Sequence, residues 1–448
     1  MRKFLLLAAL TGSLVHAAGA GATATGWLTY GHDLARTSYT PERAPPAPKP
    51  HQAWLLKLRG HVTSQVLAAD VPVLGRTLYV ATTAGMVYAV AVNGTIRWTA
   101  SLGSLVHTCE QLDSYGVTGT PVVDPVTSAL YAVDAFGLLH AFDLATGAER
   151  TGWPVKLYDD FKSEMVWGAL TSLGGAIYVG TGSYCDRPME GKVIRVDTAT
   201  RTLTSWIAVP RRLGGGGSIW GWGGVSYSPR RKTLLVVTGN AFRGGKNSGR
   251  DFSERAGFGE QLVELTPKLT VRAASHPRNI SRIGDFDFVG APLAFSRTGC
   301  GELVAALNKN GRAYLWRSGR IRDGPISSVR VAGGTIVSEL AYSPRSHALY
   351  AVTYQRVVRI DTARCKLRVR WARRLGANLF NSSPTIARDL VWCVRNADDS
   401  TLLAVDARTG GVRFEVKIGQ IVFAAPIVLG GTVYVGSFDG GLAAFPLG

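Results

Sequence analysis

The sequence lacks the patterns that mark most metal and haem proteins. Its five cysteines are never adjacent, and they form neither a CxxC nor a CxxCH motif, which excludes a cysteine zinc site and covalent c-type haem. It contains no HExxH motif, and its eight histidines show no paired spacing that would suit a metal ion. We therefore expect none of the histidines to be a ligand.

Acidic residues are also scarce, with 31 Asp and Glu against 50 Lys and Arg and a net charge of +19. Such a charge could attach an exported protein to an anionic cell wall. The alternative is a scatter of arginines over a solvated surface, because the short basic runs 211–212, 230–232 and 373–374 lie far apart. No aromatic platform accompanies them, so we expect no specific binding of nucleic acid.

Long apolar runs are missing apart from one at the N-terminus. Arg2 and Lys3 precede an apolar stretch from Phe4 to Val15, and small residues follow as far as Ala20. This pattern predicts a secretory signal peptide and short leader over residues 1–24. The stretch is too short to span a bilayer, although an uncleaved interfacial anchor is an alternative. We expect a secreted or periplasmic protein that does not span the membrane.

What the chain has is a repeat. A phrase of short apolar runs rich in Val, Tyr and Leu, separated by Gly, Asn and Asp turns, recurs eight times, mostly at intervals of 42 to 57 residues. The copies begin at Leu78, Leu130, Ile177, Leu234, Leu303, Leu349, Val391 and Thr432. The composition and the alternation are those of β-strands. A further strand with small residues precedes each copy, which makes four strands in each unit.

Four strands per unit predict an all-β fold, a single eight-bladed β-propeller with antiparallel blades over residues 25–448. The last copy stops at Gly448, just after its third strand. An orphan strand near the N-terminus, residues 52–60 around Trp54, matches the missing fourth strand. We expect it to pair with the last blade and close the ring, which removes an open sheet edge.

The opening segment from Trp27 to Tyr39 resembles the N-terminus of pyrroloquinoline-quinone (PQQ) repeat proteins. The phrase Ala-Val-Asp-Ala-x-Thr-Gly, as at residues 404–410, resembles their repeat consensus. The resemblance covers nearly the whole mature chain and is closest to a secreted bacterial subgroup in residues 109–147 and 178–269. It implies either a dehydrogenase that uses PQQ with Ca²⁺ or a non-catalytic scaffold, because both occur in the family.

The family's alcohol dehydrogenases stack PQQ between a Trp and a disulfide of adjacent cysteines, which this sequence lacks. Their calcium-binding Glu and Asn and their catalytic Asp match no motif here. We therefore expect a monomeric binding or scaffold protein for a protein or cell-wall ligand. The alternative is a PQQ-dependent oxidoreductase with a variant cofactor site that binds PQQ and Ca²⁺.

In a propeller, the loops that enter the innermost strands and those that join the second and third strands share one face. The candidates on that face are Glu110, Trp167, Trp220, Trp222, Asp285, Asp287, Glu339 and Asn381. Trp220 and Trp222 flank a glycine that suggests close backbone approach. They predict either a stacking platform for a planar cofactor or packing between blades.

The acidic candidates on this face also have two interpretations each. Asp285 and Asp287 could form a weak calcium site, since hard cations need converging oxygens, or a solvated loop. Glu339 could bind a ligand, together with Asn381, or form a buried ion pair with an arginine. The recurring Asp143, Asp197, Asp361 and Asp406 are expected to cap turns.

The positions of the cysteines in the repeat predict two disulfides between adjacent blades. Cys109 and Cys185 fall on one face, in blades two and three. Cys300 and Cys365 fall on the opposite face, in blades five and six. Cys393 lies in a strand of blade seven and is expected to be a buried free thiol.

Overall fold

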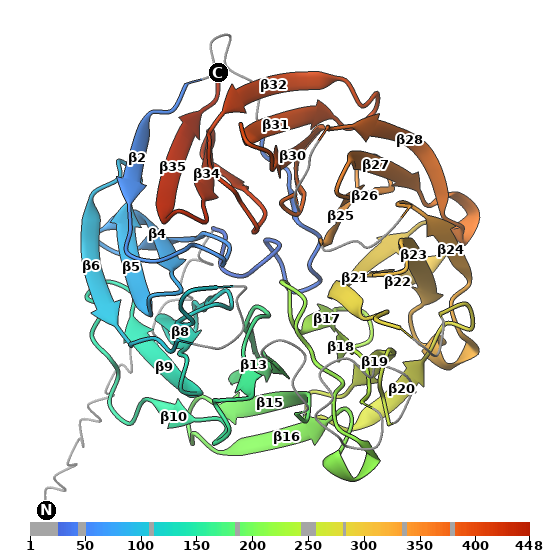
Figure 1. Ribbon diagram of the computed structural model, residues 1–448, viewed down its shortest axis with the longest axis horizontal. Coiled ribbons are helices and arrows are strands. Elements are labelled where there is room, and N and C mark those ends of the chain that lie inside the picture. The colour runs from blue at the N-terminus through green and yellow to red at the C-terminus, as the bar shows by residue number, and fades with distance from the viewer. Residues whose placement is uncertain are drawn as a thin grey trace, which may run out of the picture.

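The computed structural model describes residues 26–43, 51–106, 112–183, 189–242, 257–280, 284–333, 338–376 and 381–448. Eight antiparallel sheets stand around a central axis in this part of the chain, and each forms one blade of a propeller (Figure 1). We number them blades 1 to 8 in chain order. The expected signal peptide, residues 1–24, lies outside the described residues.

Each blade has four strands, which are counted from the innermost outward. Blades 1 and 2 consist of β3 (Leu67–Val71), β4 (Gly75–Ala81), β5 (Met86–Ala91) and β6 (Ile96–Ser101), then β7 (Val122–Asp124), β8 (Ala129–Val133), β9 (Leu138–Asp143) and β10 (Val155–Lys156). Blades 3 and 4 consist of β12 (Thr171–Leu173), β13 (Ala176–Gly180), β15 (Lys192–Asp197) and β16 (Leu203–Ile207), then β17 (Ser226–Ser228), β18 (Thr233–Val237), β19 (Leu262–Leu265) and β20 (Val271–Ser275).

Blades 5 and 6 consist of β21 (Phe288–Arg297), β22 (Gly301–Asn308), β23 (Arg312–Arg317) and β24 (Ser327–Arg330), then β25 (Leu340–Ser343), β26 (Ala348–Val352), β27 (Arg356–Asp361) and β28 (Arg368–Arg374). Blades 7 and 8 consist of β29 (Thr385–Ala387), β30 (Leu390–Arg395), β31 (Thr401–Asp406) and β32 (Val412–Lys417), then β33 (Ile427–Leu429), β34 (Thr432–Gly436), β35 (Gly441–Pro446) and β2 (Trp54–Lys57).

Little structure lies outside the blades. A short strand β1 (Tyr39–Thr40) adds to blade 7 in parallel with β29, and β11 (Glu164–Met165) pairs with β14 (Gly182–Ser183). The described helices are the single 3₁₀ turns η1 (Arg211–Leu213), η3 (Ile321–Asp323) and η4 (Ala363–Cys365). None of the helices in the described ranges is long and apolar enough to cross a membrane.

Strand β2 closes the ring, and this confirms the predicted fold. It pairs antiparallel with β35, from Trp54 opposite Ala444 to Lys57 opposite Gly441. The indole of Trp54 lies over Gly94 of blade 1 and donates a hydrogen bond to the Val92 carbonyl (3.0 Å). The first and last parts of the chain therefore hold the same blade together.

The same contact between a Trp and a Gly explains the repeated sequence phrase. Trp98 in the fourth strand of blade 1 lies against Gly147 of blade 2, where a Cβ would approach the indole to 2.5 Å. Trp98 Nε1 donates to the Leu144 carbonyl (3.0 Å). Trp371 lies against Gly410 of blade 7 in the same way. The glycine is required because the neighbouring indole occupies the space of a side chain.

Aspartates hold the turns that contain Gly147 and Gly410, and a third such turn occurs in blade 3. Asp143, Asp197 and Asp406 each accept backbone hydrogen bonds from the residues two and three positions ahead, at 2.8–3.1 Å. Such bonds hold a turn in place, as expected. Asp361 is followed by the 3₁₀ turn η4, and its carboxylate pairs with Arg359 (2.8 Å), as Asp197 does with Arg195 (3.1 Å).

The N-terminal segment 27–40 runs around the inside of the channel, where Figure 1 shows it in blue at the centre. Its carbonyl groups accept hydrogen bonds from the innermost strands of six blades in turn: from Ala68, Val123, Tyr227, Ala294, Tyr342 and Ile386, at 2.7–3.1 Å. Arg36 contacts blade 3, where it donates to Thr171 Oγ1 (2.6 Å). The segment, whose role the sequence did not reveal, thus joins most of the blades from within.

Candidate functional site

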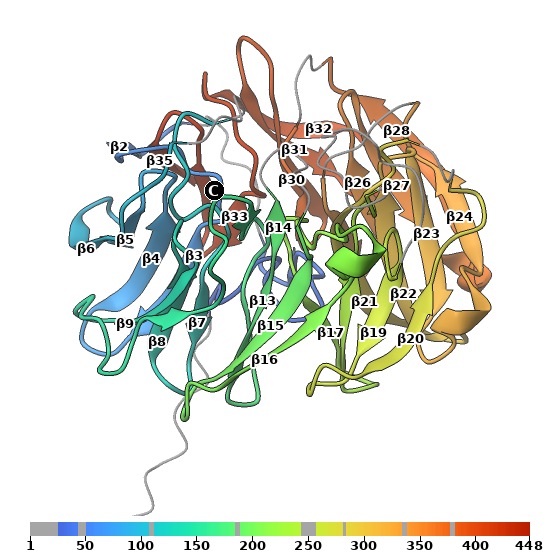
Figure 2. The ribbon, with the colours of Figure 1, turned by 60° about the horizontal axis from the view of Figure 1, so that its bottom comes forward.

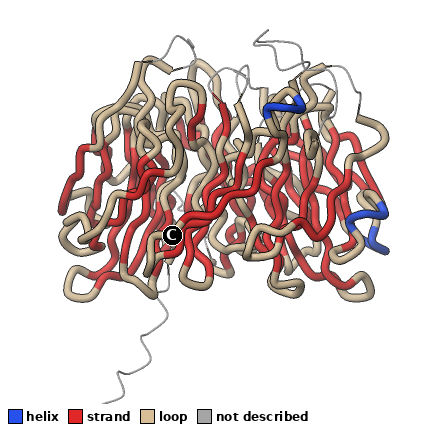
Figure 3. The backbone as a smooth tube through the Cα atoms, turned by 90° about the horizontal axis from the view of Figure 1, so that it is seen from below, coloured by secondary structure: helices blue, strands red, loops and turns tan. Residues whose placement is uncertain are grey.

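Strands run between two rims of loops when the propeller is seen from its side (Figures 2 and 3). We call one rim the mouth face. It carries the loops that enter the innermost strands and those that join the second and third strands of each blade. Of the sequence-based candidates, Glu110 lies outside the described residues, and the others lie on this face.

Aromatic side chains cross the channel at the mouth face. Trp167 of blade 3 and Trp222 of blade 4 meet edge to face, with ring centroids 6.0 Å apart. Trp222 then lies nearly parallel to Phe423 of blade 8, at 6.1 Å and 25°. Blades 4 and 8 are opposite each other in a ring of eight, so this contact spans the axis.

Two further rings continue this row. Phe423 meets Phe438 at 5.2 Å, and His61 of blade 1 stacks on Phe438 at 4.0 Å and 2°. We call Trp167, Trp222, Phe423 and Phe438 the aromatic bridge. All four are half-buried. They therefore close the channel at this end while offering apolar surface to a ligand.

Trp220 belongs to a separate group at the boundary of blades 4 and 5. Lys309 Nζ lies 5.1 Å from the centre of its indole. The same ammonium contacts both oxygens of Asp285 (2.8 and 2.9 Å) and Asp287 Oδ2 (3.0 Å). The structure thus brings Asp285 and Asp287 together, and Lys309 lies between them. We call these four residues the Lys309 cluster.

Asn240, three residues after the second strand of blade 4, completes this group. Its backbone N–H donates to Asp287 Oδ1 (2.5 Å), and its side-chain amide donates to Asp285 Oδ1 (2.9 Å). Asn240 Oδ1 and Trp220 Nε1 are both buried without a hydrogen-bond partner. A free acceptor and a free donor therefore lie next to the cluster, which points to a polar ligand.

One ammonium faces two carboxylates in the cluster. Burial lowers the pKa of Lys309, but Asp287 and Asp285 outweigh burial and raise it well above its usual value. Burial raises the pKa of Asp287, and Asp285 adds to this against the effect of Lys309. Lys309 is therefore protonated at neutral pH, and the cluster has no surplus positive charge.

The described residues do not fit a divalent cation in this arrangement. Calcium requires roughly six to eight oxygen ligands, whereas the ammonium of Lys309 occupies the position between the two carboxylates. No group of three or more His, Cys, Asp or Glu that could hold a metal occurs among the described residues. PQQ carries three carboxylates, and the ammonium of Lys309, the cation of this cluster, is already neutralised by Asp285 and Asp287.

Glu339 is buried beside the channel, and both of its carboxylate oxygens accept hydrogen bonds from backbone N–H groups. Its two oxygens accept the N–H groups of Gly223 (2.6 Å), which precedes the innermost strand of blade 4, and Ala291 (2.7 Å), which lies within that of blade 5. Burial raises the pKa of Glu339 to about 7 against the effect of these hydrogen bonds. Backbone N–H groups thus occupy both oxygens, where the sequence had suggested either a ligand or an arginine.

The side chain of Asn381 is likewise hydrogen-bonded to backbone groups. Its amide donates to the Thr353 and Tyr354 carbonyls (2.6 and 2.9 Å), and its oxygen accepts the Asn396 N–H (2.9 Å). These bonds connect blades 6 and 7. Glu339 and Asn381 therefore hold blades in position, and neither presents a free polar atom to a ligand.

Glycines at the mouth face allow the close packing that the sequence suggested. A Cβ on Gly221, between Trp220 and Trp222, would lie 2.4 Å from the backbone of Gly290. A Cβ on Gly290 would lie 2.5 Å from Glu339 Oε2. The two tryptophans flank the point where the backbones of blades 4 and 5 meet, and they therefore point to different surroundings.

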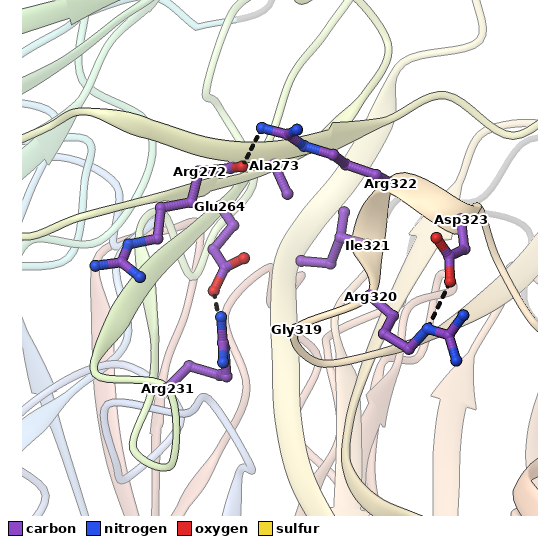
Figure 4. A pocket seen from close by; sticks show the side chains of 9 residues that line it. All are labelled: Arg231, Glu264, Arg272, Ala273, Gly319, Arg320, Ile321, Arg322 and Asp323. Atoms are coloured by element: carbon purple, nitrogen blue, oxygen red, sulfur yellow. Dashed lines mark hydrogen bonds and ion pairs between the residues drawn. The ribbon is translucent and has the colours of Figure 1, made fainter.

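Outside the mouth face, a cavity of about 550 Å³ lies between blades 4 and 5 (Figure 4). It is lined by Arg231, Glu264, Arg272, Ala273, Gly319, Arg320, Ile321, Arg322 and Asp323. Arg231 pairs with Glu264 (3.5 Å), and Arg320 pairs with Asp323 (2.6 Å). Because these charges already have partners, the cavity is a weaker candidate than the mouth face.

One predicted disulfide lies within the described residues. Cys300, in the turn after β21, is bonded to Cys365 in η4, with Cα atoms 5.6 Å apart. This bond joins blades 5 and 6. Cys393 is a buried free thiol. Cys109 and Cys185 lie outside the described residues, so the pairing between them stays a prediction.

Sequence reasoning missed four residues of the mouth face: Asn240, Lys309, Phe423 and Phe438. Asn240 follows Thr238-Gly239 at a strand end, and Lys309 precedes an Asn-Gly turn. Both positions lie in loops between second and third strands, so the repeat phase could have placed them on this face. Asn240 reaches the carboxylates because neighbouring blades stack, and Lys309 reaches them because blade 5 folds back on itself; no local pattern encodes either contact.

Comparison with known proteins shows where this architecture occurs. Residues 301–447 match the family model described as outer membrane protein assembly factor BamB. No curated protein matches the chain. Among solved structures, a europium-containing methanol dehydrogenase superposes with a TM-score of 0.72 at 16% identity, covering 94% of this chain and 98% of the other.

Two other structures are similar. A quinohemoprotein alcohol dehydrogenase from Comamonas testosteroni has a TM-score of 0.71 at 17% identity, covering 94% of this chain and 80% of the other. BamB from Moraxella catarrhalis has a TM-score of 0.60 at 14% identity, covering 89% and 100%. At these identities the likeness concerns the fold, which both enzymes and an assembly factor share.

Proposed function

We propose that this chain, which belongs to the PQQ-repeat β-propeller family, is a secreted protein that binds a ligand at its mouth face without quinoprotein chemistry. The observation that carries the proposal is the position of Lys309. Its ammonium contacts Asp285 and Asp287 at 2.8–3.0 Å, where a cofactor's cation would need these oxygens. The absence of adjacent cysteines agrees with this proposal.

The chemistry of the mouth face suits an uncharged polar ring, such as a sugar. The aromatic bridge provides flat apolar surface, and sites for small molecules combine such surface with a few polar groups. Trp220 Nε1 and Asn240 Oδ1 are both buried without a partner, and they supply a donor and an acceptor to hydroxyl groups of a ligand that enters beside them. The Lys309 cluster has two carboxylates for its one ammonium, so it favours an uncharged ligand over a polyanion.

Secretion is proposed on two grounds. The N-terminal pattern of Arg2, Lys3 and an apolar run is typical of a signal peptide. The Cys300–Cys365 disulfide is typical of an oxidising compartment.

A second candidate is a PQQ-dependent oxidoreductase with a variant site. The observation in its favour is the convergence of Trp220, Asn240, Asp285 and Asp287 on one boundary between blades. Binding of a cofactor there would require Lys309 to leave the carboxylates. The two candidates therefore differ in what they predict for this one side chain.

Calorimetric titration of the purified protein with PQQ, with and without Ca²⁺, separates the two. We expect no binding at high micromolar PQQ and no dye-linked reduction with alcohols or sugars. Lys309→Met should release the two carboxylates and create measurable Ca²⁺ affinity, whereas Lys232→Met, which changes an exposed lysine, should not. Tight PQQ binding with dye reduction by the wild-type protein would establish the second candidate instead.

The binding role is tested with neutral oligosaccharides and tryptophan fluorescence. A ligand of the mouth face should change the emission of the wild-type protein, and Trp222→Ala should weaken its binding at least about tenfold by removing apolar contact. Trp54→Phe, on the outer strand of blade 8, serves as the control. Equal binding by the Trp222 and Trp54 variants would place the ligand elsewhere.

A further inference from the structure

One structural position recurs in all eight blades, so the residues that occupy it can be compared from blade to blade. In each blade, the first residue of the third strand lies directly opposite the last residue of the fourth strand. The position lies on the outer edge of the mouth face, away from the channel. We call it the rim position.

Single cations at the rim position have carboxylate partners. Blades 2, 3, 7 and 8 each place one lysine there: Lys156, Lys192, Lys417 and Lys57. Their partners are Asp159 (2.5 Å), Glu164 (2.9 Å), Asp399 (3.2 Å) and Asp439, respectively. Blades 1 and 4 place no charged residue there.

Blades 5 and 6 differ from the other six. Arg312 lies directly opposite Arg330, and Arg356 lies directly opposite Arg374. Like charges directly opposite on neighbouring strands destabilise a sheet. Arg312 donates to Ser328 Oγ (3.0 and 3.3 Å), and within the described residues none of the four forms an ion pair with a carboxylate.

The first acidic residues after the two pairs are Glu339, which accepts backbone N–H groups, and Asp389, which pairs with Arg345 and Arg388. Residues 331–338 and 375–388, which follow the two pairs, contain neither Asp nor Glu. Arg373 adds another exposed guanidinium beside Arg374. Strands β24 and β28, which carry three of these residues, are the outer strands of neighbouring blades (Figure 1). We call Arg312, Arg330, Arg356, Arg373 and Arg374 the arginine rim.

Protection of sheet edges explains single charges but not these pairs. An outer strand that carries a charge resists pairing with another chain, and the partnered lysines of the other blades already provide this protection. Two arginines that lie directly opposite each other without carboxylate partners add repulsion, and they do not improve this protection of the edge. A repulsive pair that recurs at the same position of adjacent blades indicates an external counter-ion.

We infer that the arginine rim binds an acidic polysaccharide, a ligand distinct from that of the mouth-face channel. Guanidinium groups bind carboxylate, sulfate and phosphate oxygens through paired hydrogen bonds. A polymer can bridge both blades at once, which a single anion cannot. The large hydrophobic side chains that the described residues expose are all aliphatic, so no platform for stacking bases accompanies the rim.

Binding to immobilised heparin, a sulfated polysaccharide, tests the inference. We expect binding that weakens as salt rises, because phosphate- or sulfate-like groups release counter-ions on contact with arginine. The double variant Arg356→Gln/Arg374→Gln should weaken binding at least about tenfold at 0.15 M salt and flatten its salt dependence. Its thermal midpoint should equal or exceed the wild-type value, because a repulsive pair is removed.

A matched control removes the same charge elsewhere. Arg320→Gln/Arg413→Gln changes two exposed arginines that already pair with Asp323 and Asp406. This variant should bind heparin within about twofold of the wild type. Equal losses in both double variants would show that only bulk charge acts and would overturn the inference. Tighter binding of single- or double-stranded DNA through the same rim residues would also overturn it.

Discussion

The carboxylate of Glu339 accepts the backbone N–H of Gly223 at 2.6 Å, and this bond connects two blades that are not neighbours in sequence. Its second oxygen accepts the Ala291 N–H of the blade between them. One side chain at the start of blade 6 thus satisfies buried donors of blades 4 and 5. The stability of this half of the ring should depend on it.

Glu339→Gln is expected to destabilise the protein by about 1–3 kcal/mol at pH 5. At pH 5 the buried carboxyl of Glu339 is protonated, but both of its oxygens keep acceptor capacity, whereas the amide nitrogen of glutamine cannot accept a hydrogen bond, so one buried N–H loses its acceptor. Urea unfolding measures the change as a lower midpoint with an unchanged slope. Glu415→Gln, an exposed glutamate on β32, should leave the midpoint unchanged. A wild-type midpoint for Glu339→Gln would contradict the assigned role.

The pH dependence of this difference follows from the pKa of Glu339. Burial raises that pKa to about 7 from its usual 4.5, so the folded protein holds the proton more tightly than the unfolded chain. The resulting contribution to stability is complete below pH 4.5 and is lost as the pH rises to about 7. The stability advantage of the wild type over Glu339→Gln should therefore be larger at pH 5 than at pH 8. Unfolding curves of both proteins at the two pH values measure this, and an advantage that grows with pH would refute it.

Arg36→Lys is expected to destabilise the protein by about 2–4 kcal/mol, because the ammonium of a lysine cannot reproduce the several hydrogen bonds that the planar guanidinium donates. The guanidinium of Arg36 donates to the Tyr30 carbonyl (2.9 Å), Thr171 Oγ1 (2.6 Å) and the Val225 carbonyl (2.9 Å). It thereby connects the N-terminal segment with blades 3 and 4. Thermal unfolding measures the effect, with Arg43→Lys as an exposed control. Equal midpoints for the two variants would show that these contacts contribute little.

Peptide mapping without reduction is expected to recover Cys300 linked to Cys365, and also Cys109 linked to Cys185. Cys393 should remain unmodified by iodoacetamide at pH 8 until the protein unfolds, because it is buried and burial raises its pKa to about 12. Detection of Cys393 in any disulfide would contradict this assignment.

Cys300→Ser/Cys365→Ser is expected to lower the free energy of unfolding by about 2–4 kcal/mol, since the bond closes a long loop in the unfolded chain. Denaturant titration measures the loss, and the reduced wild-type protein should show the same loss. A difference between the two would mean that the serines, and not the missing bond, cause the change.

The amino-acid sequence by itself determined the strands, the number of blades and the closure. These features rest on local physics: alternation of apolar residues, turn formation by aspartate and glycine, and the recurrence of Trp at one phase of the repeat. Trp54 was recognisable as part of a fourth strand because it shares that phase with Trp98. The repeat phase also placed Cys300 and Cys365 on one face of adjacent blades.

Only the tertiary structure decided which side chains meet. Lys309 reaches Asp285 and Asp287 because blade 5 folds back on itself, and Trp222 meets Phe423 because the ring brings opposite blades together across the channel. The direct opposition of Arg356 and Arg374 likewise depends on strand register, which a bulge between Arg359 and Ile360 shifts by one residue. Contacts of this kind depend on register and on distant segments, so short-range sequence patterns do not encode them.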